Sequence, residues 1–126
     1  MPLHWTIDSR ERLFTATGDG EVTFADAMSL LEALVGAKAM SYRKLLDARA
    51  AKSTMAGDEL LALCGQIRVY HEEGPVGALA LVGTAEQTMG CSRLLGALAA
   101  ADRPIRAFHS LRPARYWLGL QGSRWS

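Results

Sequence analysis

The sequence predicts an α/β fold in which a mixed sheet of about five strands combines with four helices and the first strand is antiparallel. Two short segments rich in β-branched and aromatic residues follow each other near the N-terminus, separated by only three residues, and so short a connection permits antiparallel pairing alone. Segments with helical spacing of apolar residues then alternate with short apolar runs. This alternation is typical of parallel strands joined by right-handed crossovers.

The N-terminal hairpin is predicted to consist of strands over residues 3–8 and 12–17, connected through residues 9–11. The first helix is predicted to begin after Thr23, because Asp26 stands three residues later and the two complete a capping box. Its apolar residues at helical spacing are Phe24, Ala27, Met28, Leu31, Leu34 and Val35.

A short strand over residues 42–48 and a second helix are predicted next. Leu45 and Leu46 stand at the centre of this strand and Asp47 at its carboxyl end. The second helix ends at residues 71–75, where glycine and proline occur together. Its apolar face consists of Leu60, Leu61, Cys64 and Ile67.

The continuous apolar run 78–82 predicts a central strand covered on both faces. Gly77 and Gly83 bound this run. Thr84, with Gln87 three residues later, is expected to cap a third helix. The apolar residues of that helix are Met89, Leu94, Leu95 and Leu98.

The last two predicted elements are a strand over 105–109 and a helix over 111–120, with Ser110 as the cap of the helix. No linker rich in proline, glycine or serine divides the chain, and no internal repeat is present. We therefore expect a single domain over residues 1–120, followed by a C-terminal tail over 121–126.

Composition excludes several classes of protein. The chain has 126 residues, of which 49% are hydrophobic, and a net charge of +1, so it can form a core and does not bind nucleic acid through bulk charge. Its two cysteines are too few for a disulfide scaffold. No apolar run is long enough to span a membrane, and the N-terminus lacks the pattern of a signal peptide, so we expect a cytoplasmic protein. Arginine far exceeds lysine, which indicates a bacterial origin.

Four motifs resemble the SpoIIAA-like superfamily, which includes STAS domains and small bacterial STAS/SEC14-like proteins. They are GEVT at 20–23, LLDARA at 45–50, ALALV at 78–82 and FHSLRPARYWL at 108–118. The resemblance implies a β/α superhelix and a non-enzymatic STAS-like protein-interaction domain. The SEC14-like relatives imply an alternative, a domain that binds a small apolar or lipid-like molecule.

The chain departs from the phosphoregulated members of that superfamily at the start of the second helix. Those proteins carry Asp-Ser-Ser-Gly there and are switched by phosphorylation of one serine, whereas this chain has MAGD at 55–58. Ser53 and Thr54 precede that position and do not fill it. We therefore expect no partner switching by phosphorylation at the usual serine.

The glycine-rich segment 18–23 imitates a dinucleotide-binding fingerprint, since it precedes a helix and Asp47 stands at the end of the next strand. The third glycine, which lets helix and strand pack closely, is missing, and Thr23 is accounted for as a helix cap. A glycine-rich turn without a cofactor is the preferred interpretation.

No group of residues indicates an enzyme or a metal site. The segment 90–94 resembles half of a nucleophile elbow, but a leucine replaces the second glycine and no base is positioned to activate Ser92. Cys64 and Cys91 stand among leucines and alanines, as buried apolar residues do. The histidines, which share no ligand spacing, are His4, His71 and His109.

Polar residues are expected to gather where the parallel strands end, because anions and ligands bind at that edge of α/β sheets. The candidate residues for binding a ligand or a partner are Asp47, Arg49, Ser53, Thr54, Thr84, His109 and Arg112. In the alternative interpretation, Thr84 and Ser110 only cap helices, and Asp47 pairs with Arg49.

Self-association as a two-fold dimer is also predicted. Right-handed crossovers along a monotonic strand order would collect the helices on one face of the sheet. The other face would then be open to loops, the tail or a partner. Trp5, Ile7, Phe14 and Trp125 are bulkier than a solvated surface requires, and exposed aromatic area marks contact surfaces. In the alternative, the chain's own tail covers these residues.

Overall fold

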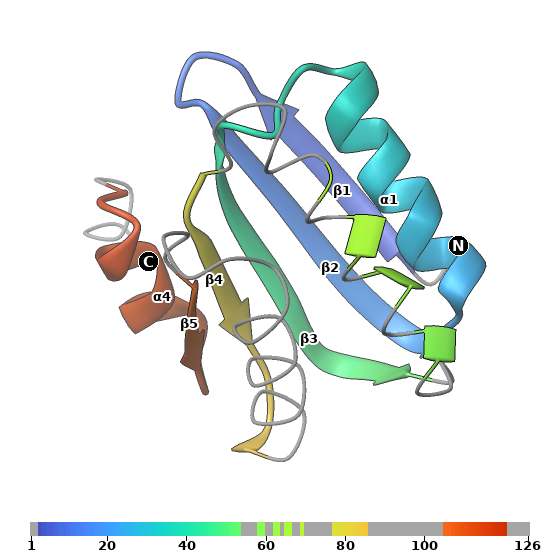
Figure 1. The fold of residues 1–126 in the computed structure, drawn as a ribbon. Coiled ribbons are helices and arrows are strands. Elements are labelled where there is room, and N and C mark those ends of the chain that lie inside the picture. The colour runs from blue at the N-terminus through green and yellow to red at the C-terminus, as the bar shows by residue number, and fades with distance from the viewer. Residues whose placement is uncertain are drawn as a thin grey trace.

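The structure is a computed structural model that describes residues 3–53, 58–59, 62–63, 65–66, 69, 77–85 and 105–120. Within this part the chain forms five strands and two continuous helices (Figure 1). In chain order they are β1 (Leu3–Asp8), β2 (Leu13–Val22), α1 (Phe24–Gly36), β3 (Arg43–Ser53), β4 (Leu79–Val82), β5 (Ile105–Phe108) and α4 (Leu111–Trp117). Residues 58–59, 62–63, 65–66 and 69 are also helical, within the expected second helix. The expected third helix, apart from its first residue, Ala85, lies outside the described residues, as does the tail 121–126.

The five strands form one sheet in the order β1-β2-β3-β4-β5. β1 pairs with β2 in antiparallel fashion and the other neighbours are parallel, so the predicted mixed sheet with an antiparallel first strand is confirmed. At the β1–β2 turn, Oδ1 of Asp8 accepts hydrogen bonds from the backbone N–H groups of Arg10 (3.0 Å) and Glu11 (3.1 Å), as aspartates in such turns commonly do.

β2 and β3 are longer than predicted, which corrects two expectations. The segment 18–20 is not a glycine-rich turn, because β2 runs through it to Val22. A Cβ added to Gly18 would lie 2.7 Å from the Cβ of Ala51, so glycine is needed where β3 passes closely. Asp47 does not end its strand, because β3 continues to Ser53. The apolar pattern stops earlier than β3 does, because the last residues of β3 pair with β2 alone.

Alternating residues of the strands build two separate cores on the two faces of the sheet. On one face, Phe14 and Ala16 of β2 pack with Leu31 and Leu34 of α1. The core of the other face, against which α4 packs, consists of Leu13, Leu45, Ala80, Val82, Ala114, Leu118 and Leu120. α1 and α4 therefore cover opposite faces, α1 over the β1 side and α4 over the β5 side (Figure 1). The expectation that all helices collect on one face is wrong.

The bulky residues that suggested an open face lie under α1. Phe14 is buried, with 2% of its surface exposed, and Trp5 packs partly buried against the same core. Ile7, on the same side of β1, is 39% exposed. The argument for a dimer from an uncovered aromatic face therefore does not hold for Trp5 and Phe14, and Trp125 lies outside the described residues.

The two helix starts differ in their caps. At α1 the predicted capping box is confirmed, since Asp26 N donates to Thr23 Oγ1 (3.2 Å) and Thr23 N donates to the Asp26 carboxylate (2.9 Å). At α4 the side chain of Ser110 makes no capping hydrogen bond, so the expected cap is wrong. Packing holds α4 instead, because Ala114 is fully buried and the rings of Trp117 and Phe108 lie 5.8 Å apart.

Candidate functional site

The beginning of β3 is fixed by a buried lysine. Lys44 is only 4% exposed, and its ammonium Nζ donates to the carbonyl oxygens of Met40 (2.5 Å) and Tyr42 (2.8 Å), with that of Gly77 at 3.4 Å. A buried charge is tolerated where such acceptors surround it. We call these four residues the Lys44 corner; it joins the α1–β3 loop to the segment that enters β4.

Gly77 is part of this corner because no side chain fits there. An added Cβ would lie 2.2 Å from the carbonyl oxygen of Tyr42 and 2.5 Å from that of Ser41. The close approach lets Gly77 N donate to the carbonyl oxygen of Met40 at 2.9 Å. Together with the Lys44 hydrogen bonds, this contact sets how β3 and β4 enter the sheet, and so where the next residues of β3 lie.

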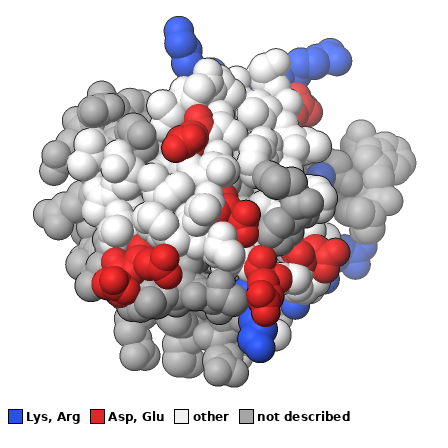
Figure 2. All heavy atoms as spheres, turned by 90° about the vertical axis from the view of Figure 1, so that its right-hand side faces the viewer, with Lys and Arg blue, Asp and Glu red and all other residues white. Residues whose placement is uncertain are grey.

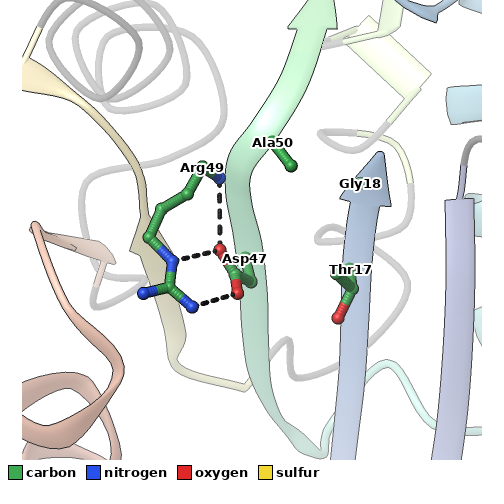
Figure 3. Close-up of a pocket in the computed structure, with 5 residues that line it drawn as sticks. All are labelled: Thr17, Gly18, Asp47, Arg49 and Ala50. Atoms are coloured by element: carbon green, nitrogen blue, oxygen red, sulfur yellow. Dashed lines mark hydrogen bonds and ion pairs between the residues drawn. The ribbon is translucent and has the colours of Figure 1, made fainter. Parts of the chain in front are cut away.

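Three residues further along β3, Asp47 and Arg49 form the polar wall of a shallow pocket of about 300 Å³. Thr17 of β2 is the register partner of Asp47, and Gly18 and Ala50 complete the lining. Figure 3 shows the side chain of Arg49 folded back along β3 onto the Asp47 carboxylate, with Thr17 on the neighbouring strand. The pairing of β2 and β3 changes register between Thr17 and Asp19, and this irregularity lies beside the pocket.

Asp47 and Arg49 are fully engaged with each other. The guanidinium donates from Nε to Oδ1 (2.9 Å) and from Nη2 to Oδ2 (2.8 Å), while the backbone N–H of Arg49 donates to Oδ1 (3.1 Å). The side-chain hydrogen bond from Arg49 lowers the pKa of Asp47, although partial burial opposes it, and the same bond raises the pKa of Arg49. An ionised carboxylate held this way is a poor general base, since a base must accept a proton near neutral pH.

The other predicted site residues do not join this pair. β4 ends level with Asp47, so Thr84 and His109 follow the ends of β4 and β5 near that level. His109 Nδ1 lies 3.2 Å from the carbonyl oxygen of Gly83, and neither it nor Thr84 lines the pocket. The structure therefore brings Asp47 and Arg49 together, as the alternative interpretation of the sequence expected.

The remaining candidates stand apart from the pocket. Ser53 ends β3 opposite Val22, and Thr54 lies outside the described residues. Arg112 is in the first turn of α4 and exposed, and it does not line the pocket. In the described part of the chain, no group of three or more histidine, cysteine, aspartate or glutamate residues is arranged to hold a metal ion. Cys64 and Cys91 are outside that part.

Sequence analysis did not single out the outer edge of β1. Among the strands that the structure describes, β1 has β2 on one side and is the last of the sheet on the other. The side chains of His4, Thr6 and Asp8 point away from α1 and are exposed, whereas Trp5 and Ile7 lie on the α1 side. Figure 2, which views the molecule from the side where α1 lies, shows a largely uncharged surface on which acidic groups are scattered, most of them in the lower half, with basic groups near the rim. The alternation of polar and apolar residues over 4–8 was the sequence pattern that could have pointed to this edge.

No helix in the described residues is long and apolar enough to cross a membrane. No protein-family model matches the sequence, and no curated protein matches it significantly. Among solved structures, the chain is similar to a protein from Shewanella loihica PV-4, described as an uncharacterised member of the DUF3478 family with a SpoIIAA-like fold. The TM-score is 0.65, the sequences are 17% identical, and the match covers 92% of this chain and 93% of that one. Together with the strand order described above, this similarity shows that the chain has a SpoIIAA-like α/β fold.

Proposed function

We propose that this chain is a non-catalytic, STAS-like protein-interaction domain that contacts its partner through the outer edge of β1. The observation that carries the proposal is a strand of six residues, Leu3–Asp8, whose outer side pairs with no other strand of the described residues. Proteins that leave a sheet edge in water usually protect it with lysine, proline or a bulge. Within Leu3–Asp8 there is no lysine and no proline, and β1 pairs with β2 without a register shift.

The state of the polar pocket supports a role in binding rather than in catalysis. Asp47 is ionised and held by Arg49 on both carboxylate oxygens, and Thr17, the adjacent hydroxyl, has no base beside it in the pocket lining. Activation of a hydroxyl nucleophile needs such a base within hydrogen-bonding distance. The proposal also concerns regulation. Partner binding is not switched by phosphorylation at the start of the second helix, because the residues MAGD at 55–58 contain no hydroxyl group that a kinase could phosphorylate.

The alternative, a domain that binds an apolar or lipid-like molecule, is less well supported. The pocket beside Asp47 is shallow and contains a charged pair, whereas sites for such ligands are concave and mostly apolar. Native mass spectrometry of the purified protein separates the two functions, because it reports a co-purified small molecule and the oligomeric state together.

A random-peptide display library tests the proposed function directly. We expect selection of peptides in which apolar and polar residues alternate, since a peptide that adds a strand to an edge presents every second side chain to each face. Ile7→Lys, which places a protecting lysine on the edge strand, should weaken their binding at least tenfold. Ser29→Lys adds the same charge at an exposed position of α1 and should leave binding unchanged.

Hydrogen exchange locates the bound peptide. Peptide binding should slow exchange of the amides in residues 3–8 relative to the rest of the described sheet. Selected peptides that bind Ile7→Lys as tightly as the unmodified protein, or that protect the Asp47 pocket instead, would refute the edge as the contact surface. Failure to enrich any peptide on a protein that is also monomeric would refute the interaction function itself.

A further inference from the structure

We infer that the partner of the β1 edge is a second copy of this chain, paired antiparallel about a two-fold axis so that Thr6 faces the partner's Thr6. This inference rests on the proposed function and names the occupant of the edge. It would join the two sheets into one continuous sheet through β1, the outermost strand in Figure 1. Two-fold pairing uses the same surface on both copies, so β1 must be complementary to itself.

The geometry of an antiparallel pair limits the possible registers. A two-fold axis perpendicular to the sheet keeps α1 on the same side of both copies, and it must pass beside a residue that faces its own counterpart. The side of β1 under α1 bears Trp5 and Ile7, and the opposite side bears His4, Thr6 and Asp8. Within a strand of six residues, the registers with substantial overlap are those centred on Trp5 and on Thr6.

The register centred on Thr6 gives five complementary pairs, counting both copies. Thr6 faces the partner's Thr6 at the centre. On the α1 side, Trp5 faces the partner's Ile7, and the same pair recurs across the axis. On the other side, His4 faces the partner's Asp8, again twice. Threonine pairs and aromatic residues opposite β-branched ones are cross-strand combinations that stabilise antiparallel strands. The Asp8 carboxylate facing His4 is an acceptor for an imidazole N–H.

The register centred on Trp5 pairs apolar residues on the α1 side but leaves Asp8 without a partner. It places Trp5 against the partner's Trp5 and Leu3 against the partner's Ile7. His4 then faces the partner's Thr6, and Asp8 lies beyond the end of the partner's strand. Only the Thr6 register places the His4 imidazole opposite the Asp8 carboxylate, and this pairing of a hydrogen-bond donor with an acceptor selects it.

The local environment of β1 leaves these groups available. Oδ1 of Asp8 accepts the turn hydrogen bonds from Arg10 and Glu11, whereas Oδ2 has no hydrogen bond to another described residue and can accept from an imidazole N–H. On β2, the register partners of His4 and Asp8 are Thr17 and Leu13, so no charge on that strand competes directly. Pairing would also cover Ile7, which is 39% exposed in the single chain.

Disulfide trapping tests the register. In a Cys64→Ser, Cys91→Ser background, Thr6→Cys places two thiols directly opposite each other, at a Cβ separation close to the upper limit for a disulfide. With oxidised glutathione as the acceptor of the two electrons, we expect most of the protein to run as a covalent dimer on a non-reducing gel. His4→Cys is the matched control, because it lies exposed on the same side of β1 and its two thiols would be about 13 Å apart along the strands.

A charge series tests the pairing in the unmodified strand. His4→Asp would place two carboxylates opposite each other at both ends of the interface, and His4→Lys would place an ammonium group opposite each Asp8 carboxylate. We expect sedimentation equilibrium to show at least a tenfold weaker dimer for His4→Asp and an unchanged or tighter dimer for His4→Lys, with both variants folded by circular dichroism. Equal weakening by both variants would contradict the charge pairing.

The outcomes separate this inference from the proposed function. Cross-linking of His4→Cys as readily as Thr6→Cys would overturn the register. A monomeric protein whose Thr6→Cys variant does not cross-link would overturn self-pairing, and the proposed function would stand if selected peptides still bound the edge and lost affinity in Ile7→Lys. Cross-linking confined to Thr6→Cys, together with the expected charge series, would establish the second copy as the partner.

Discussion

Two positions on the same strand hold charged side chains in opposite ways. At the start of β3, Lys44 is 4% exposed and is surrounded by three backbone carbonyl oxygens, two from the α1–β3 loop and one from the segment that enters β4. Three residues later, Asp47 binds Arg49, whose side chain is 45% exposed. The first arrangement links parts distant in sequence, and the second is a local pair. We therefore expect the fold to depend more on Lys44 than on the Asp47–Arg49 pair, because Lys44 is buried and joins segments that are distant in sequence.

Gly77→Ala should have the largest effect on the Lys44 corner. The added Cβ would overlap the backbone carbonyl oxygen of Tyr42, to which it would lie 2.2 Å away. Because backbone cannot move aside as a flexible side chain does, we expect a loss of at least about 3 kcal/mol in the free energy of unfolding. Urea denaturation measures this loss.

Gly36→Ala is the control for that substitution. A Cβ at Gly36, the last residue of α1, meets nothing within 4 Å. Since alanine favours helix over glycine, this variant should be neutral or more stable by less than about 1 kcal/mol. Similar losses in the two variants would show that the close approach at Gly77 does not constrain the fold.

Lys44→Met should have the next largest effect. It keeps most of the volume of the side chain but removes the donor that serves the carbonyl oxygens of Met40 and Tyr42. Leaving such buried acceptors without a partner costs about 2 to 3 kcal/mol in the free energy of unfolding. Lys52→Met, at an exposed position of β3, should change it by less than about 0.5 kcal/mol. Equal stability of the two variants would mean that the buried ammonium contributes nothing to the corner.

Asp47→Asn should have a smaller effect, because an exposed ion pair contributes little. We expect the unfolding temperature to fall by about 2 °C or less. Arg49 lowers the pKa of Asp47 from its ordinary value of 3.8, so the folded state binds the proton more weakly than the unfolded chain does. The contribution of the pair is therefore fully present above about pH 4 and is lost as the pH falls through the lower pKa of the folded state.

Denaturation of the unmodified protein and of Asp47→Asn over a pH series checks this sign. The difference in stability between them should be constant near neutral pH and should shrink below about pH 4. A difference that instead grew in acid would contradict the direction of the pKa shift.

The contrast between local pairs and contacts distant in sequence also explains which features could be predicted from the sequence. The Thr23–Asp26 capping box and the Asp47–Arg49 pair join residues two or three positions apart, and both are visible in a linear pattern. The prediction that Gly18 lies in a turn was wrong. Glycine is needed there because the Cβ of Ala51, on the neighbouring strand, leaves no room for a side chain.

Other features depend on neighbours that a single sequence does not display. The burial of Lys44 could not be predicted, because the backbone carbonyl oxygens that accept its hydrogen bonds come together only in the folded chain. The long ends of β2 and β3 were missed because they pair with each other outside the main core, where the apolar pattern fades. The candidate edge at β1 was missed because His4 and Asp8 would complement each other only across two copies.

The smallest expected effect lies at the far end of β3, where a phosphorylation switch would have to act. Ser53 is the last residue of the strand and pairs with Val22, and the positions corresponding to Asp-Ser-Ser-Gly are MAGD at 55–58. Asp58, which is exposed, would also repel a phosphate attached nearby. Incubation with an anti-sigma kinase and ATP should leave the intact mass unchanged, while the kinase's own antagonist gains one phosphate in the same reaction. A stable gain of one phosphate on Ser53 or Thr54 would instead mean that the switch has moved toward the strand end, and the dimer should then be remeasured with the phosphate in place.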